Sequence, residues 1–350
     1  MTQVFFGGPD KPSGLLRNLL AKHVDCVPPG GEILWATYYF RDLGLAEALV
    51  RARHRGVTVK LCIEASPKLK SANDAVRRRL ASADGLGQGI RPIWHLLPAH
   101  LHEKVYIFSH PFPVAFIGSF NPSGNTPEDP IVIREIGDQD RGHNYLAEID
   151  DPLIVESLKR HVLSLYAGKL RMFERYIKST NEDLTTDRFS IFYFPRSDKS
   201  LVSRLLSDRK YERVRIAVSH FRDRHLMRLL ARLAREGTSV EVIAHDTLRR
   251  VPRWIETFAK AQGIAFVRYA HPLDLPMHSK FILLAGNGFQ RVLFGSMNLT
   301  RTSLLLNHEI LVAADDEPDI FDTFNARWEH MLAEAQDFRN QPKGHDVHFS

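Results

Sequence analysis

The stretch AHLHEKVYIF at residues 99–108 returns as PMHSKFILL at residues 276–284, and the rest of the chain can be aligned around these two copies. In each copy a His and a Lys stand two residues apart where an apolar run typical of a buried strand begins. These are His102 with Lys104 and His278 with Lys280. Because side chains alternate between the two faces of a strand, each copy predicts an imidazole beside an ammonium on one face.

A second motif follows each copy at nearly the same distance. Gly-Ser-x-Asn begins at Gly118, 16 residues after His102, and at Gly295, 17 residues after His278. One His-x-Lys match is expected by chance in a chain with 17 His, but two copies with this matched spacing are not. The motif pair therefore indicates a duplication. It adds four polar candidates to the site: Ser119, Asn121, Ser296 and Asn298.

The duplication extends beyond the motifs. The tripeptide Phe-Arg-Asp occurs at 40–42 and again at 221–223, an offset of 181, against 176 between the two motif histidines. Each half reads as alternating strands and helices, a pattern that predicts a mostly parallel sheet with its site at strand ends. We expect two duplicated α/β halves, residues 1–178 and 179–350, flanked by helices and related by a pseudo-twofold axis. The two His-x-Lys faces would then meet in one composite site.

Composition sets further limits. A chain of 350 residues is longer than one hydrophobic core usually supports, and 44% hydrophobic with 25% charged residues is ordinary for a globular protein. No apolar run approaches the roughly 20 residues of a membrane helix, and the first residues lack a signal-like pattern, so we expect a cytoplasmic protein without integral membrane association. The two cysteines exclude a disulfide scaffold. A net charge of +6 favours polyanionic partners.

The candidate residues suit transfer of a phosphoryl ester group. One neutral imidazole attacks phosphorus, and the other, protonated, donates to the leaving oxygen. The lysines would neutralise the non-bridging oxygens, while the Ser and Asn side chains donate hydrogen bonds to them. A carboxylate behind a ring fixes its tautomer, and Glu135 and Glu309 follow the two Gly-Ser-x-Asn segments at comparable places. We expect both to hold the rings, and we expect no metal or other cofactor.

The paired His-x-Lys, Gly-Ser-x-Asn and trailing Glu motifs resemble those of the phospholipase D superfamily. The resemblance implies two α/β halves about a pseudo-dyad and a metal-independent reaction through a phosphohistidine. It also implies that His102 is the nucleophile and His278 the general acid. The family's Asp five residues after the Lys is replaced by Ser109 and Ala285, which brings the chain closer to tyrosyl-DNA phosphodiesterase-like enzymes than to the lipid-acting branches.

Basic residues favour a nuclease acting on DNA or RNA. They cluster in corresponding segments of the two halves, where they could track a phosphate backbone or form a solvated helix face. They are Lys68, Lys70, Arg77, Arg78 and Arg79 in the first half and Arg249, Arg250 and Arg253 in the second. The alternatives are a phospholipid-acting phospholipase D or phosphatidyltransferase, and a catalytically silent nucleic-acid-binding module. The sequence identifies no helicase or ATPase partner.

Overall fold

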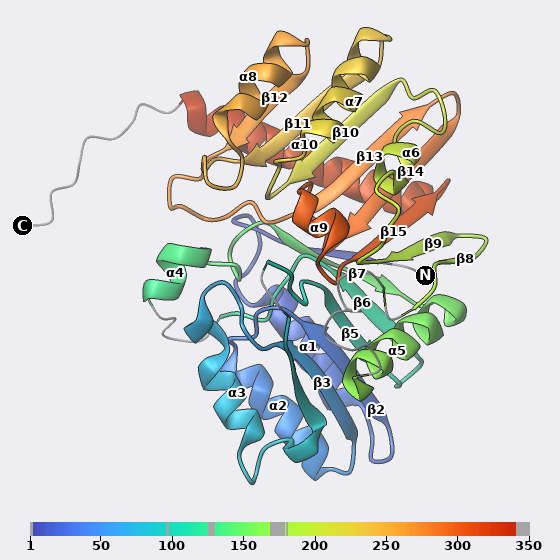
Figure 1. Ribbon diagram of the computed structural model, residues 1–350. Coiled ribbons are helices and arrows are strands. Elements are labelled where there is room, and N and C mark those ends of the chain that lie inside the picture. The colour runs from blue at the N-terminus through green and yellow to red at the C-terminus, as the bar shows by residue number, and fades with distance from the viewer. Residues whose placement is uncertain (1–2, 96–97, 125–129, 169–178, 180, 341–350) are drawn as a thin grey trace, which may run out of the picture.

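A computed structural model describes residues 3–95, 98–124, 130–168, 179 and 181–340, and contains two large sheets (Figure 1). The first has the strand order β1-β7-β6-β5-β2-β3-β4. Its strands are β1 (Val4–Gly7), β2 (Glu32–Thr37), β3 (Thr58–Glu64), β4 (Ile90–Ile93), β5 (Lys104–Phe108), β6 (Val114–Gly118) and β7 (Asn144–Ile149).

The second sheet has the strand order β12-β11-β10-β13-β14-β15-β9-β8. Its strands are β8 (Leu184–Thr185), β9 (Phe189–Tyr193), β10 (Arg213–Val218), β11 (Ser239–His245), β12 (Ala265–Tyr269), β13 (Lys280–Gly286), β14 (Phe289–Gly295) and β15 (Ile310–Asp315). Seven strands correspond one to one between the sheets, from β4-β3-β2-β5-β6-β7-β1 to β12-β11-β10-β13-β14-β15-β9, so the predicted duplicated α/β architecture is confirmed.

Helices cover both sheets, and two of them lie between the sheets. In the first half α1, α2 and α3 share a core with the outer face of the sheet, and in the second half α6, α7 and α8 do so. The central core contains the inner faces of both sheets together with α5 and α10. The helices are α1 (Leu15–Cys26), α2 (Leu43–His54), α3 (Asp74–Ala81), α4 (Pro130–Ile136), α5 (Pro152–Ala167), α6 (Leu201–Leu205), α7 (Arg224–Arg235), α8 (Arg253–Ala261), α9 (Arg301–Leu305) and α10 (Pro318–Asn340), with short 3₁₀ turns η1 (Lys70–Asn73) and η2 (Gly87–Gly89).

The repeated Phe-Arg-Asp tripeptide starts equivalent helices. The Asp42 side chain accepts the backbone N–H of Leu45 at 2.6 Å at the start of α2, and Asp223 accepts that of Leu226 at 2.8 Å at the start of α7. Both carboxylates therefore cap the free amide groups of a helix N-terminus. The same motif makes the same turn in each half, directly after β2 and β10.

The predicted parallel sheets are wrong for most strand pairs. Only β2-β3-β4 and β10-β11-β12 are parallel, and the other neighbours are antiparallel. The reason is the length of the connections after the His-x-Lys strands. β5 ends at Phe108 and β6 begins at Val114, while β13 and β14 are separated by Asn287 and Gly288. Connections this short cannot make a parallel crossover.

The predicted division of the chain after Lys178 falls on a residue outside the described ranges, so this boundary stays a prediction. The strands of the first sheet all precede it and those of the second all follow it. Tyr145 on β7 links the halves, because its hydroxyl lies 2.7 Å from the Lys280 carbonyl oxygen and accepts the Gly295 N–H at 2.8 Å. In the described part of the chain, no helix has both the length and the apolar character required to cross a bilayer.

Candidate active site

The antiparallel strand order gathers the motifs of each half at one edge of its sheet. His-x-Lys leads into β5 or β13, Gly-Ser ends the neighbouring strand β6 or β14, and the next strand, β7 or β15, begins beside it. The strands on the other side, β2 and β10, end at the same edge because they run antiparallel to β5 and β13. Residues far apart in each half are therefore brought to one rim.

Two symmetric backbone bridges join these edges across the halves. Leu101 forms a parallel bridge with His308, and His143 forms one with Met277. The His102 N–H donates to the His308 carbonyl oxygen at 2.9 Å, and the His278 N–H donates to that of His143 at 2.9 Å. The backbone of each motif histidine is thus held by the opposite half of the chain.

Glu309 from the second half orients the ring of His102 in the first. The Nδ1 atom of His102 lies 2.9 Å and 3.0 Å from the two carboxylate oxygens, and Ser296 donates its hydroxyl hydrogen to the same carboxylate at 2.6 Å. Burial lowers the pKa of His102 to about 4, although the Glu309 charge opposes this shift. With Nδ1–H directed at the carboxylate, the Nε2 lone pair of a neutral ring is available to attack phosphorus.

Asn144 from the first half orients the ring of His278 in the second. The Nδ1 atom of His278 lies 2.9 Å from Asn144 Oδ1, which also accepts the Ser119 hydroxyl at 3.2 Å. The Asn144 amide nitrogen donates to the Gln139 carbonyl at 2.8 Å, which fixes the direction of the oxygen. Burial and the charges of Lys280 and Lys104 hold the pKa of His278 well below 6.5. The two rings therefore differ in their partners, a carboxylate for one and an amide for the other.

The prediction that Glu135 holds a ring is wrong. Glu135 lies on α4 with 49% of its side chain exposed, and Asn144 occupies the equivalent of the Glu309 position. The motif serine and its partner are 25 residues apart in the first half and only 13 in the second. The longer connection contains α4. A carboxylate selected by its distance from the Gly-Ser-x-Asn segment therefore falls within this insertion.

Replacing Glu135 by Gln should therefore change kcat by less than about twofold, because its side chain does not reach either imidazole. Asn144→Ala should lower kcat by about 10- to 100-fold through loss of ring orientation. Steady-state hydrolysis of bis(p-nitrophenyl) phosphate by the two variants, with matched thermal unfolding curves, measures this contrast. A large loss of kcat in Glu135→Gln would instead show that the Glu135 carboxylate acts in the site.

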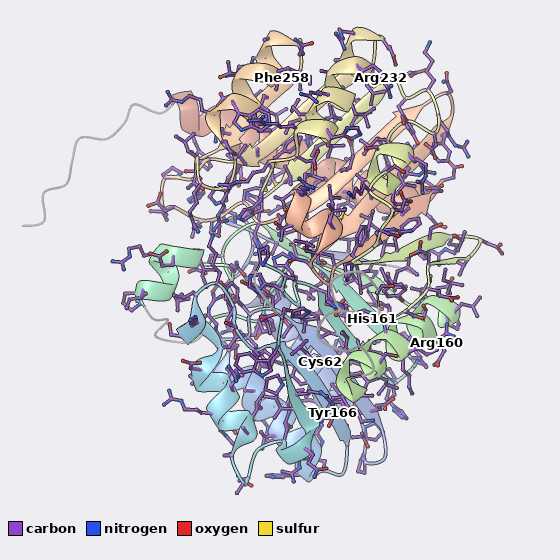
Figure 2. The ribbon with its side chains drawn as sticks, in the orientation of Figure 1. Cys62, Arg160, His161, Tyr166, Arg232 and Phe258 are labelled. Atoms are coloured by element: carbon purple, nitrogen blue, oxygen red, sulfur yellow. The ribbon has the colours of Figure 1, made fainter. Side chains whose placement is uncertain are left out.

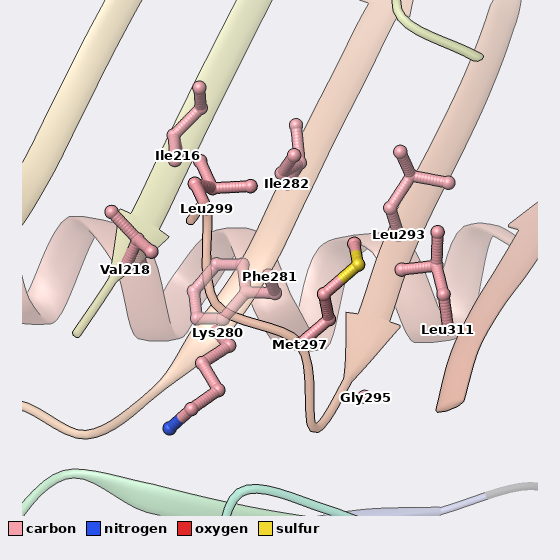
Figure 3. A pocket seen from close by; sticks show the side chains of 11 residues that line it. Ile216, Val218, Lys280, Phe281, Ile282, Leu293, Gly295, Met297, Leu299 and Leu311 are labelled. Carbon is pink, nitrogen blue, oxygen red and sulfur yellow. The ribbon is translucent and has the colours of Figure 1, made fainter. Parts of the chain in front are cut away.

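Lys104 and Lys280 are almost fully buried, with 0% and 3% of their surface exposed. Each ammonium donates to the backbone carbonyl of the histidine two residues before it. Burial lowers the pKa of Lys104 to about 8, opposed by Glu309 and Glu103, while burial and the Lys104 charge hold the pKa of Lys280 well below its usual value. Figure 3 shows Lys280 at the edge of an apolar hollow lined by Ile216, Met297 and Leu299, with its nitrogen directed away from these residues toward the first half.

The motif Ser and Asn residues differ from the predicted phosphate donors. Ser119 and Ser296 are fully buried, and their hydroxyl hydrogens are directed at Asn144 and Glu309. Asn121 accepts the Tyr39 N–H at 3.2 Å and donates to Gln139 at 2.8 Å. These three residues therefore position other groups. Asn298 accepts the His220 N–H at 3.2 Å, and its amide nitrogen has no hydrogen-bond partner within the described residues.

His220 is a candidate that the sequence analysis missed. It follows β10, with Nδ1 3.2 Å from the Ser219 hydroxyl, and burial together with Arg250 and Lys280 holds its pKa well below 6.5. The charge of His102 also acts on it. The offset of 181 that relates the two Phe-Arg-Asp tripeptides aligns His220 with Tyr39, directly before each tripeptide. This position next to a repeated motif is the sequence feature that could have identified His220. The polar environment of the site thus includes a third imidazole.

A buried pair lies behind Lys104. Glu103 and His161 are each 0% exposed, and His161 Nε2 is 2.7 Å from the Glu103 carboxylate. His161 is labelled on α5 in Figure 2. The carboxylate projects from the opposite face of the strand to Lys104, and its charge helps to keep the Lys104 pKa from falling further. The dipeptide Glu103-Lys104 therefore supplies both an anchor to α5 and a cation for the site.

The eight predicted basic contacts do not form one surface. The charges of Arg249 and Arg250 act on Lys68 across the two halves, and Arg250 itself is buried. On α3, Arg79 pairs with Glu47, while Arg77 and Arg78 donate to backbone carbonyl oxygens. Lys70 and Arg253 are exposed at the starts of η1 and α8. For the residues away from Lys68, nucleic-acid binding stays a prediction.

The donor set of the site favours phosphate over a metal ion. Each motif histidine directs Nδ1 at a fixed partner, and the positive charges of Lys104 and Lys280 act on both rings. Such charges repel a divalent cation and attract a phosphate oxygen. The arrangement can therefore hold a phosphodiester between two imidazoles whose Nδ1 atoms have different partners.

Comparisons with known proteins agree with this geometry. The family model described as "Cardiolipin synthase, PLD-like domain" matches residues 30–128 and 202–332. No curated protein matches the chain in a sequence search.

Several solved structures have the same fold at low sequence identity. Phosphatidylserine synthase from Haemophilus influenzae Rd KW20 is 13% identical with a TM-score of 0.69, and the match covers 95% of this chain and 86% of that one. Polyphosphate kinase from Porphyromonas gingivalis is 14% identical with a TM-score of 0.61, and this chain spans only 50% of its length while 95% of this chain is covered. Yeast tyrosyl-DNA phosphodiesterase is 12% identical with a TM-score of 0.51, and 89% of each chain is covered.

Proposed function

This chain belongs to the phospholipase D superfamily, and from that premise we propose that it is a metal-independent phosphodiesterase, a nuclease that cleaves DNA or RNA. The observation that supports the reaction is the reciprocal arrangement of the two rings, in which each half holds the other half's histidine. A site that exists only between the halves needs both motifs. A binding module would not require two imidazoles with opposed partners.

In the proposed reaction each ring acts through its Nε2 atom, because its Nδ1 atom lies against a fixed partner. The Nε2 atom of His102 attacks phosphorus, an N–P bond forms, and the bond from phosphorus to the leaving oxygen breaks. Protonated His278 donates its Nε2 proton to that oxygen. Water then attacks phosphorus, gives a proton to His278, and the N–P bond breaks to release the product phosphate ester and neutral His102.

The carboxylate behind His102 supports its assignment as the nucleophile. The ring becomes cationic when its Nε2 bonds to phosphorus while Nδ1 keeps its proton, and the Glu309 charge stabilises that cation at 2.9 Å. His278 faces a neutral amide at 2.9 Å, which leaves it freer to release a proton to the leaving oxygen. Lys104 and Lys280 stabilise the charge on the non-bridging oxygens.

A nucleic-acid substrate is supported by charge. The chain carries a net charge of +6, and basic residues of both halves act on one another beside the site. Phosphate groups of a strand attract such residues independently of base sequence. This choice of substrate rests on electrostatics alone, and base recognition forms no part of it.

Exposed apolar residues favour a second candidate, a phospholipid substrate. On α4, Ile131 and Ile133 are 52% and 36% exposed, and Leu248 is 52% exposed beside Arg249, whose side chain donates to the last turn of α4. Apolar side chains next to basic ones are typical of surfaces that lie on anionic membranes. An experiment must therefore distinguish lipid cleavage from nucleic-acid cleavage.

The test is incubation of the full chain with single- and double-stranded DNA, RNA, and vesicles of phosphatidylcholine or cardiolipin, all in excess EDTA. We expect cleavage of a nucleic acid with undiminished rate in EDTA, no lipid turnover, and no reaction by His102→Ala. Lipid cleavage alone would replace the nuclease with the second candidate. Activity that disappears with EDTA would contradict the metal-independent mechanism.

A further inference from the structure

Three cationic side chains from three connections surround the rim of the site, and we call Lys68, Arg222 and Arg249 the rim cluster. Lys68 follows β3 in the first half, whereas Arg222 follows β10 and Arg249 follows β11 in the second. The three are exposed, and the Arg222 guanidinium donates to the Arg249 carbonyl oxygen. The cluster therefore exists only where the halves meet, as the catalytic site does.

A continuous set of contacts connects the rim cluster to the imidazoles. The Lys68 N–H donates to the Tyr38 hydroxyl at 2.7 Å, and the Tyr38 ring lies 5.0 Å from the ring of His102. The Lys104 ammonium lies 5.7 Å from the same tyrosine ring. On the other side, Arg250 follows Arg249 directly, and its charge acts on His278. The rim cluster thus lies one residue layer from the reacting groups.

The rim cluster is strongly positive, and Glu135 is the acid whose charge acts on Lys68, where it opposes the lowering of the pKa. Within the described residues, no carboxylate forms an ion pair with Lys68, Arg222 or Arg249. Arginines elsewhere do form such pairs, as Arg188 does with Glu317 at 2.9 Å and Arg291 with Asp208 at 2.7 Å.

Proximity of like charges is unfavourable, and an anion between them removes the repulsion. The repulsion acts on Lys68, because burial and the charges of Arg249 and Arg222 lower the pKa of its ammonium group.

One phosphodiester does not need these charges, because Lys104 and Lys280 already face the scissile group. We propose that the rim cluster binds a second phosphate of the substrate, the backbone phosphate adjacent to the scissile one in a nucleic-acid strand. This inference rests on the proposed nuclease function and adds a subsite to it. A nucleic-acid strand carries one such phosphate per nucleotide, so its neighbour is always present. Backbone contacts of this kind position a strand without reading its sequence.

The experiment is a cycle between protein and substrate. The protein change is Lys68→Ala with Arg222→Ala, leaving Arg249 intact because its side chain also donates to the Glu135 carbonyl at 3.1 Å. The substrate change places an uncharged methylphosphonate on one side or the other of a single cleavable linkage in an oligonucleotide. Either change alone should lower kcat/KM by about tenfold, and both together should lower it little further. The slope of the salt dependence of binding should also fall by about one unit, since one phosphate contact is lost.

Two controls make the result specific. Arg232→Ala removes an exposed cation from α7, on the outer side of the second sheet (Figure 2), and should not alter the cycle. The double variant should lose several-fold less kcat/KM toward bis(p-nitrophenyl) phosphate, which has one phosphate, than toward the oligonucleotide. If the wild type cleaves oligonucleotides and the two losses multiply independently, the rim subsite is wrong and the nuclease stands. If it hydrolyses only the one-phosphate ester or lipids, the nuclease proposal is wrong and this one with it.

Discussion

His278→Asn should convert the enzyme into a protein that reacts once and stops, with the substrate's phosphoryl group attached to His102. A p-nitrophenyl ester of a nucleotide does not need a proton donor, because p-nitrophenolate is a good leaving group. The first step should therefore proceed, while hydrolysis of the N–P bond lacks its base. We expect a burst of about one p-nitrophenolate per protein and a turnover at least about a thousandfold below wild type.

The control for this experiment is His102→Asn, which should give no burst and no adduct. Mass spectrometry of the intact His278→Asn protein should show the added nucleotidyl group, and peptide mapping should place it on His102. The His102 side chain is 14% exposed and His278 is 6% exposed, so both replacements are made in buried surroundings. Thermal unfolding must therefore show that each variant is folded. A burst from His102→Asn but not from His278→Asn would reverse the assigned roles.

Asn144→Asp should move the alkaline limb of the pH profile of kcat/KM upward by one or more pH units. The proposed reaction requires His102 neutral and His278 protonated. The pKa of His278 lies well below 6.5 because of burial and the charges of Lys280 and Lys104. The wild-type rate should therefore fall as the pH rises through this lowered pKa. A carboxylate in place of the amide, 2.9 Å from Nδ1, stabilises the imidazolium and raises its pKa by about one to three units. The protonated acid then persists to higher pH.

The reciprocal variant, Glu309→Gln, should act on the other ring. Removal of the carboxylate lowers the pKa of His102 below its value of about 4, so the acidic limb should move downward. The rate at the optimum should fall by about 10²- to 10⁴-fold, since the phosphorylated ring loses its counter-charge. Profiles of kcat/KM from about pH 2.5 to 9 for a one-phosphate ester measure both shifts. An Asn144→Asp profile that shifts only on its acidic side would mean that His278 is not the acid.

Much of the fold was readable because the duplication repeats short motifs at matched spacing. His-x-Lys and Gly-Ser-x-Asn mark strand starts and ends, and they placed His102, His278 and the two lysines at one edge of each sheet. Strand direction was predicted less well. The alternation of strands and helices before the motifs indicates parallel pairing, and it holds for β2-β3-β4 and β10-β11-β12 only.

What the sequence could not supply depends on contacts between the halves. Asn144 carries no charge and lies beyond an insertion, so a search for a carboxylate selected Glu135 instead. Arg222 and His220 follow β10, and they are recognisable as candidates only from their interactions with Lys68 and His102 of the other half. Ser119 and Ser296 were identified, but their role as supports became clear from the hydrogen bonds that hold Asn144 and Glu309.

The unequal partners of the two rings have an evolutionary consequence. Two identical subunits encoded by one gene would present the same residue to both imidazoles, so a carboxylate on one side would bring a carboxylate on the other. Fusion of two gene copies lifts this constraint, because each copy can then mutate by itself. Glu309 and Asn144 record such a divergence. In the proposed mechanism the attacking and proton-donating tasks are fixed on separate histidines, whereas identical subunits would have to exchange them between equivalent ones.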